Sequence, residues 1–288
     1  MKEKFENKII VPIDFSDHCR HSIFHAMYTA KQLKSEVILI HVINHQRKVR
    51  MQKENISIKD LEEKFKTIQD KYSQEKDINI SFLIREGNLF EVITTEALEQ
   101  KAYMMVLAAH KKTGLKQWFG DNALKLVTKS PIPTLVVQDS EIHDYAKKMV
   151  FPIHNFTEAR QKVQWAILLS KVFKLTVHIL RQHQSEIDSK YRLNIITEQI
   201  EEEFQKYDVP FILEETETGK HFADSLIEYA GKINANMITI LTNADIFSPD
   251  FNHVAWDEKI MYNKENTPVL MINPDKLGEV YYEYLTLF

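Results

Sequence analysis

The stretch KIIVPIDF (residues 8–15) recurs 140 residues later as KMVFPIHN (148–155), and this repeat decides the fold. Each copy is a short apolar run that ends in a proline, an isoleucine and one polar residue, Asp14 in the first copy and His154 in the second. A continuous apolar run of this length is typical of a β-strand that is covered on both faces. Two copies of one such unit predict a tandem of two similar domains.

The similarity continues along both halves. REGNLFEVITTEALEQKAYMMVLA (85–108) resembles ETGKHFADSLIEYAGKINANMITIL (217–241), and the halves end alike in SPIPTLVV (130–137) and NTPVLMIN (266–273). The stretch between the copies, DSEIHDYAKK (139–148), is polar and charged, as linkers between domains commonly are. The predicted divisions are a first domain at 1–140, a second domain at 146–276, and an aromatic C-terminal tail at 277–288.

Within the first copy, strand-like runs alternate with amphipathic stretches. Ser16 is a candidate N-cap for the first helix, in which Ile23, Met27 and Ala30 share one face. The predicted strands are 9–13, 37–43, 78–87, 103–109 and 132–138, and the predicted helices are 16–34, 56–74, 89–101 and 120–130. This alternation is typical of βαβ units and a parallel sheet.

The composition is that of an ordinary globular protein, with 44% apolar and 27% charged residues. A net charge of −4 gives no reason to expect nucleic acid or an anionic membrane as a partner. The apolar runs are too short to span a bilayer, and the charged start MKEKFENK leads straight into a strand, so we expect no signal peptide. The single cysteine, Cys19, fits a reducing compartment, and we expect the cytoplasm.

Several motifs in a fixed order resemble the universal stress protein family. They are VPID after the first strand, LIHV in the second, a Gly-Asn turn before a helix, and AHKKTGLKQWFG (109–120) followed by a helix and PIPTLVV. The second half keeps the strand framework, the PIH corner and TPVLMIN, but it lacks the loop motif. The resemblance implies an α/β fold of two tandem doubly wound, Rossmann-like domains of the adenine nucleotide alpha hydrolase type. Each would be a five-stranded parallel sheet flanked by helices, and the IPTLVV and TPVLMI edges could pair within the chain.

The family resemblance also implies a nucleotide crevice at the carboxyl ends of the strands. Members that bind ATP use the aspartate after strand one and the valine of the His-Val step to hold ribose and adenine. Here Pro12, Ile13, Asp14 and Val42 match that nucleoside side.

The phosphate side departs from the family pattern of Gly-x-x-Gly, nine residues, then Gly-Ser or Gly-Thr. The candidate residues on this side are Ala108, His110, Lys111, Gly120, Asp121 and Asn122. Ala108 and Lys111 replace the first two glycines and crowd backbone that a phosphate must approach. Asp121 replaces the hydroxyl residue and would repel a triphosphate at a helix start. Lys111 could attract a phosphate, but we predict that tight ATP binding is lost.

The second copy departs further. His154 replaces the aspartate, and the loop at 241–259 has no glycine. Its bulky side chains, Phe247, Phe251 and Trp256, predict a loop that fills its own crevice.

Histidines offer two other interpretations. His21 and His25 are spaced i, i+4 and could share a zinc ion, but they lie off the apolar stripe, no third ligand follows from spacing, and we expect solvated surface histidines. No nucleophile motif or paired-carboxylate spacing accompanies His110 or His154, so we expect no enzyme.

These observations leave three functional hypotheses. The first is a non-catalytic stress-response module without an obligatory cofactor, acting through its surfaces on an unknown protein partner, with a homodimer possible. The alternative is a sensor of ATP, AMP or adenosine, or a slow ATPase, that uses the first crevice. The third is a metal-dependent hydrolase. We expect the aromatic tail to pack onto the other domain or a second subunit, the alternative being a frayed terminus.

Overall fold

The computed structural model describes residues 7–72, 78–109, 120–139, 147–154, 162–242 and 253–273. The first half contains β1 (Lys8–Pro12), α1 (Cys19–Leu33), β2 (Glu36–Ile43), α2 (His45–Lys53), α3 (Ile58–Tyr72), β3 (Ile80–Glu86), α4 (Leu89–Glu99), β4 (Met104–Ala108), α5 (Gly120–Lys129) and β5 (Thr134–Val137). The second half contains β6 (Lys148–Ile153), α6 (Val163–Phe173), β7 (Thr176–Arg181), α7 (Ile187–Lys206), β8 (Phe211–Glu215), α8 (Phe222–Lys232), β9 (Met237–Leu241), α9 (His253–Met261) and β10 (Val269–Ile272).

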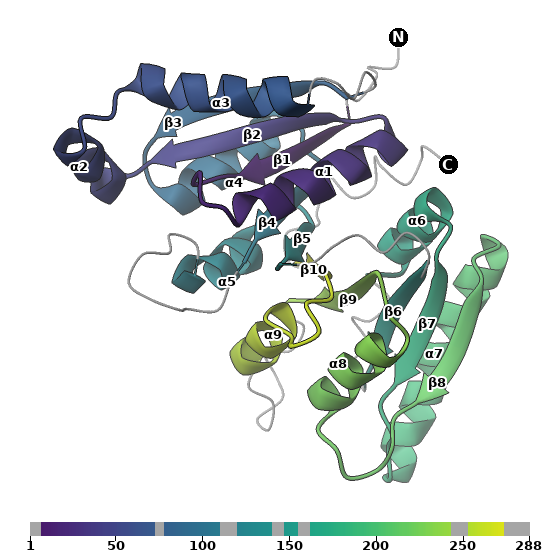
Figure 1. Ribbon diagram of the computed structural model, residues 1–288. Coiled ribbons are helices and arrows are strands. Elements are labelled where there is room, and N and C mark those ends of the chain that lie inside the picture. The colour runs from purple at the N-terminus through teal and green to yellow at the C-terminus, as the bar shows by residue number, and fades with distance from the viewer. Residues whose placement is uncertain are drawn as a thin grey trace.

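All strands join one sheet in the order β3-β2-β1-β4-β5-β10-β9-β6-β7-β8 (Figure 1). Within each half the neighbouring strands run parallel, and the second half repeats the strand order of the first. The halves meet where β5 and β10 pair antiparallel, with Val136 opposite Val269 and Leu135 opposite Leu270. The expected fold class and the expected pairing of the two edge strands are therefore confirmed.

Helices cover both faces of this sheet (Figure 1). Alternate strand residues point to opposite faces, so Ile9 and Val11 enter one apolar core while Ile10 enters the other. Ile23 of α1 and Phe65 of α3 fill the first core, together with Leu169 of α6 and Leu193 of α7. The second core takes its helix residues from α4, α5, α8 and α9, namely Ile93, Leu126, Leu226 and Ile260.

One local prediction was wrong, and one short helix was not predicted. Ser16 does not cap α1, which begins at Cys19 after His18; the Ser16 N–H instead donates to Asp14 Oδ1 at 2.9 Å. The short helix α2 was not expected, because only Met51 of its nine residues is buried and the sequence carries almost no apolar period. Asn44 starts it by accepting a hydrogen bond from the Arg47 N–H at 2.8 Å.

The two halves also meet through helices. Tyr28 of α1 stacks on Phe173 of α6, with ring centroids 5.7 Å apart and planes 13° from parallel. Both helices end in a lysine with left-handed backbone, Lys34 and Lys174, at equivalent positions of the repeat. None of the helices in the described ranges is long and apolar enough to cross a membrane.

Candidate functional site

The carboxyl ends of β1, β2 and β4 bring the predicted nucleoside residues together. β1 lies between β2 and β4, so Asp14, Val42 and Ala108 all lie at the same edge of the sheet. The Ile13 N–H donates to Ile40 O at 2.8 Å, which carries the β1–β2 ladder one residue beyond the strand. Ile13 and Val42 are 0% and 1% exposed, so their side chains belong to the core and only their backbone could meet a ligand.

Asp14 organises the turn that leads into α1. Its Oδ1 accepts from the Ser16 N–H at 2.9 Å and from the Cys19 thiol at 3.0 Å, and the Asp14 N–H lies 3.3 Å from the Cys19 sulfur. Burial, with the added charge of Asp14, raises the pKa of the Cys19 thiol to about 12. The thiol is therefore a protonated hydrogen-bond donor and no nucleophile at neutral pH.

His41 supports the same corner from β2. Its Nδ1 lies 2.8 Å from Ile13 O, and its ring is 4.8 Å from that of Phe15, which takes a left-handed φ of 62°. Burial lowers the pKa of His41 to about 4, so the ring is neutral and its Nδ1–H donates to the carbonyl. The sequence reasoning did not single out this residue. A histidine inside an apolar strand was the available signal.

The phosphate side is only partly described. Ala108 ends β4 with 6% exposure, and the Ala109 N–H already donates to Val137 O at 2.9 Å, so it is engaged in the sheet. His110 and Lys111 lie outside the described residues. Gly120, Asp121 and Asn122 begin α5, where only their backbone is described.

A cleft of about 590 Å³ lies beside this corner, at the carboxyl ends of β2 and β3. Lys48 and Glu86 form an ion pair of 2.8 Å within its lining, and Asn88 accepts from the Phe90 N–H at the start of α4. An ion pair is therefore already formed in the wall of this cleft.

Aromatic rings pack at the second crevice. Trp256 of α9 stacks on Phe222 of α8 with centroids 5.7 Å apart, and the His154 ring lies edge-on to both, at 5.9 and 6.0 Å. Trp256 is 8% exposed. These contacts are those of a crevice packed by its own side chains. Phe247 and Phe251 lie outside the described residues.

Lys162, at the start of α6, is a buried cation that the sequence reasoning missed. It is 4% exposed, and its Nζ donates to Pro152 O at 2.5 Å and to Thr239 O at 3.3 Å. The Nζ also lies 4.4 Å from the centre of the Phe151 ring. Burial lowers the pKa of Lys162 to about 7.

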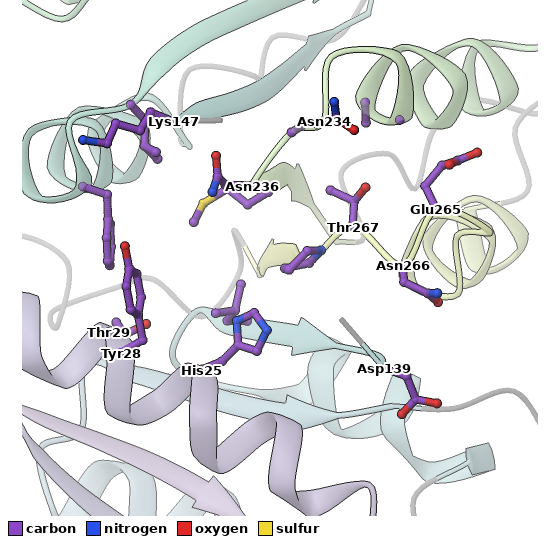
Figure 2. Close-up of a pocket in the computed structure, with 18 residues that line it drawn as sticks. His25, Tyr28, Thr29, Asp139, Lys147, Asn234, Asn236, Glu265, Asn266 and Thr267 are labelled. Carbon is purple, nitrogen blue, oxygen red and sulfur yellow. The ribbon is translucent and has the colours of Figure 1, made fainter. Parts of the chain in front are cut away.

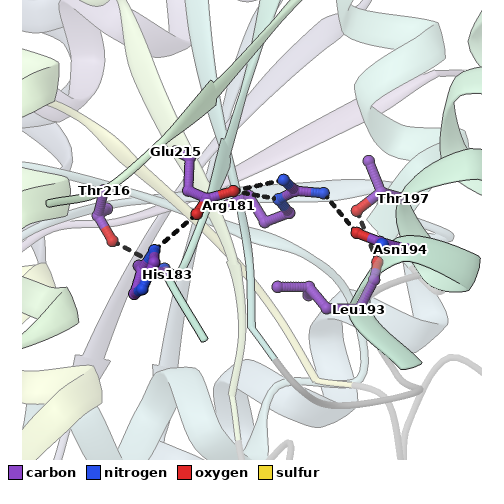
Figure 3. A network of polar contacts seen from close by, with 7 residues as sticks. All are labelled: Arg181, His183, Leu193, Asn194, Thr197, Glu215 and Thr216. Atoms are coloured by element: carbon purple, nitrogen blue, oxygen red, sulfur yellow. Dashed lines mark hydrogen bonds and ion pairs between the residues drawn. The ribbon is translucent and has the colours of Figure 1, made fainter. Parts of the chain in front are cut away.

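A polar network ties the outer strands of the second half together (Figure 3). Arg181 of β7 donates to Glu215 of β8, its partner in register, and to Asn194 Oδ1 of α7 at 2.8 Å. His183 Nδ1 lies 2.7 Å from the second Glu215 oxygen. Burial alone would raise the pKa of Glu215, but the hydrogen bonds and charges of Arg181 and His183 leave it below its usual value.

The histidines of the first helix lie differently from the expectation. His18 Nδ1 and His21 Nε2 each lie 3.3 Å from Asp139 Oδ1, beyond the end of β5. His25 is 6% exposed, so its assignment to solvated surface was wrong. His25 is buried through tertiary structure, because this face of α1 borders a pocket at the second half (Figure 2). Within the described ranges, no three His, Cys, Asp or Glu residues form a group suited to a metal ion.

Comparison with known proteins identifies relatives of this architecture. The sequence model of the universal stress protein family matches residues 6–138. A universal stress protein from Archaeoglobus fulgidus has a TM-score of 0.69 at 14% identity, over 93% of this chain and 98% of that one. A functionally unknown protein from Pseudomonas aeruginosa PAO1 has a TM-score of 0.65 at 16% identity, over 98% and 96%.

The cytoplasmic domain of a prokaryotic cation chloride cotransporter is also similar in fold, with a TM-score of 0.56 at 11% identity, over 98% of this chain and 100% of that one. No curated protein matches the sequence. At these identities the solved structures establish the shared fold, and they do so across both halves of the chain.

Proposed function

Because residues 6–138 belong to the universal stress protein family, we propose that this protein is a non-catalytic stress-response module that acts through its surfaces on a protein partner. The second half serves as a structural partner of the first. In this proposal a less charged ligand such as adenosine or AMP suits Asp14 and Val42 in the first crevice, and tight binding of a triphosphate is lost. The buried, protonated Cys19 fits a reducing compartment such as the cytoplasm.

The proposal rests most directly on the polar groups and rings of the two crevices, which already have partners within the protein. A phosphate cradle needs backbone N–H groups that point at the anion. At the end of β4 the Ala109 N–H is already used by β5, and the Asp14 carboxylate is held by the turn into α1. At the second crevice, Trp256 and Phe222 stack where the family would place a ligand.

Calorimetric titration with ATP, AMP and adenosine tests the proposal. We expect adenosine and AMP to bind at least as tightly as ATP, or none of the three to bind. Asp14→Asn should weaken any nucleoside binding, while Asp17→Asn, at an exposed neighbour, should leave it unchanged. An affinity for ATP more than about tenfold above that for AMP, about 1.4 kcal/mol, would contradict loss of the triphosphate grip.

The convergence of Asp14 and Val42 at one edge also favours the alternative, a nucleotide sensor or slow ATPase. Phosphate release from ATP that disappears in Asp14→Ala would establish it. A metal-dependent hydrolase stays a third hypothesis. Its test is the zinc content of the purified protein, where about one ion per chain or more would support it and less would end it.

A further inference from the structure

Arg47 lies in the first turn of α2, just beyond the carboxyl end of β2 (Figure 1). Its N–H donates to Asn44 Oδ1, which fixes the start of the helix. Met51, one turn further along the same face, is buried with Ile43 and Leu61. This face of α2 therefore points toward the protein, and the Arg47 side chain leaves the helix from it.

The Arg47 side chain lacks the kind of partner that comparable arginines have. Its Nε is buried, and no described residue forms a hydrogen bond with it. Arg85 and Arg181, the other partly buried arginines in the described ranges, bind the carboxylates of Glu96 and Glu215. Burial lowers the pKa of Arg47, but a guanidinium stays charged in proteins. Among the residues that the structure describes, Arg47 is therefore a partly buried cation without an ion pair, which is unusual for a buried polar group.

Lys64 of α3 supplies a second cation at the same corner. Its Nζ lies 5.6 Å from the centre of the Phe15 ring, and that ring lies 4.8 Å from the ring of His41. Burial is the main cause of the low pKa of His41, and the charges of Arg47 and Lys64 lower it further, so both cations act on this one ring. Lys64 is exposed and forms no ion pair within the described parts of the chain.

The carboxylates near Arg47 are already engaged elsewhere. Asp14, whose charge reaches Arg47, accepts hydrogen bonds from the turn into α1 and from the first residue of that helix. Glu54, the other carboxylate that acts on Arg47, forms an ion pair of 2.7 Å with Arg50. Arg47 and Lys64 are therefore available to an anion from outside the protein.

We propose that Arg47, together with Lys64, binds a phosphate group at the carboxyl edge of β1 and β2. The planar fork of a guanidinium matches the oxygens of a phosphate, and a lysine adds a point charge. A phosphate monoester carries about 1.5–2 negative charges at pH 7, which suits a pair of cations better than the single charge of a carboxylate does. The group is either free phosphate or the phosphate of a small phosphorylated molecule.

This site is separate from the phosphate side that the sequence predicted. That side includes the start of α5, which follows β4, whereas Arg47 follows β2, and β1 lies between these two strands. The proposal also goes beyond the proposed function, because a phosphate at Arg47 needs no nucleoside in the crevice. Either can fail without the other.

Calorimetric titration with inorganic phosphate tests the proposal, with acetate as the carboxylate counterpart and the ionic strength held constant. Phosphate should bind saturably, and acetate should bind at least about tenfold more weakly. Absence of saturable phosphate binding at about 10 mM, where even millimolar sites are mostly filled, would overturn the proposal. Equal affinities for acetate and phosphate would overturn the choice of ligand.

Variants with matched controls locate the site. Arg47→Gln should weaken phosphate binding about tenfold or more, and Lys64→Gln about threefold because that lysine is exposed. Arg50→Gln on the same helix and Lys66→Gln on α3 are the controls, both at exposed positions, and should keep the wild-type affinity. Arg47→Lys, which keeps the charge but not the fork, should be intermediate.

The melting temperature separates a binding role of Arg47 from a structural one. Because Arg47 has no ion pair within the described ranges, Arg47→Gln should melt at or above the wild-type temperature. A lower melting temperature combined with unchanged phosphate affinity would show a structural role and refute the assignment.

AMP and adenosine distinguish the two sources of the phosphate. If a nucleotide carries it, Arg47→Gln should weaken AMP binding about tenfold and leave adenosine binding unchanged. If free phosphate is the ligand, AMP should bind no more tightly than inorganic phosphate, and both should depend on Arg47. Binding of phosphate and AMP that is unaffected by Arg47→Gln would refute both forms of the proposal.

Discussion

Lys162 is a single residue whose burial should be visible in the stability of the whole chain. Its ammonium group has two carbonyl oxygens and an aromatic face as neighbours. Carbonyls and a ring stabilise the cation less than water and a carboxylate would, which is why its pKa falls to about 7. At neutral pH, folding therefore releases a proton from part of the population.

The free energy of unfolding should rise with pH because of Lys162. In the unfolded chain the lysine pKa is about 10.4, so between pH 7 and 10 the unfolded state binds a proton that the folded state lacks. We expect wild type to gain about 2 kcal/mol relative to Lys162→Met between pH 7 and pH 9, in urea unfolding at both pH values. Lys171→Met, at an exposed position of α6, should show no such difference. A pH-independent gap between wild type and Lys162→Met would mean that the lysine stays charged.

The Asp14 side chain gives a second residue-scale prediction. Asp14→Ala removes the acceptor of the Ser16 N–H and should lower the free energy of unfolding by roughly 1 kcal/mol, as loss of a capping side chain does. It should also lower the pKa of Cys19, although burial, the larger cause, keeps that pKa above its usual value.

The pH dependence of thiol modification by a disulfide reagent measures the second effect. Asp14→Asn keeps the oxygen that accepts from Ser16, so its stability should remain close to that of wild type. Identical stability of Asp14→Ala and wild type would show that the turn does not depend on this carboxylate.

The sequence identified some of the site residues, but it could not predict the burial or the contacts of others. Asp14 and Val42 were found because the VPID and LIHV stretches resemble motifs of the universal stress protein family. The burial of His25 and the position of Lys162 depend on what packs against a helix, and a period in one helix cannot show its tertiary partner. Asp139 was missed as the partner of His18 and His21 for the same reason, since 118 residues separate it from His21.

At the scale of elements, β8 is the outermost strand of the second half. Side-chain contacts hold it in place in addition to its backbone pairing with β7. Its side chains are mostly exposed, and Ile212 and Leu213 are 44% and 40% exposed. Exposed edge strands are prone to fraying and to pairing with other chains. The Arg181–Glu215–His183 network fastens this edge to β7 and α7.

Glu215→Gln should loosen β8 without unfolding the protein. The loss should be roughly 0.5–1 kcal/mol, because solvent screens a group about a third exposed. Amide hydrogens of 211–215 should exchange faster in the variant. Since the folded pKa of Glu215 lies below its unfolded value, the wild-type advantage is present above about pH 4.3 and is lost as pH falls through the folded pKa. Glu86→Gln, which breaks the exposed Lys48 pair of the first half, is the control and should cost less. Unchanged exchange in Glu215→Gln would contradict the role of the network.

Among the elements, strands and long helices were predictable to within a few residues, because their apolar periods are strong. The start of α1 was placed too early because Ser16 looks like a cap, whereas the Asp14 turn already binds its N–H. α2 was not predicted because it depends on the Asn44 cap and one buried methionine, and its sequence has no repeating apolar pattern.

For the whole molecule, the decisive contact is the β5–β10 pair. Two side chains reinforce it from opposite ends: Gln138 donates to Asn263 O at 2.9 Å, and Asn273 donates to Thr128 O at 2.6 Å. Both residues follow the last strand of their own half, so the repeat has placed equivalent bonds on the two sides of the junction. The family resemblance implied that these two strands lie at sheet edges that could pair, and their flanking prolines fit that position. The pocket between α1 and the second half could not be predicted from the sequence.

A continuous sheet predicts that both halves unfold together. Calorimetry of wild type should give a van't Hoff enthalpy equal to the calorimetric enthalpy. Gln138→Ala with Asn273→Ala should lower the free energy of unfolding by about 2 kcal/mol, one for each hydrogen bond, and should separate the transition into two. Two resolved transitions already in wild type would contradict cooperative coupling through the junction. Thr67→Val serves as the matched surface control.

Because the strands that join the halves belong to one polypeptide, their association follows first-order kinetics and is insensitive to dilution. A covalent tether of this kind supplies an effective concentration in the millimolar range. The paired halves should therefore stay associated at copy numbers of a few molecules per cell, where two separate subunits of ordinary affinity would dissociate. The tether also fixes which half pairs with which. The sequence of each half can therefore change without having to pair with an identical copy of itself.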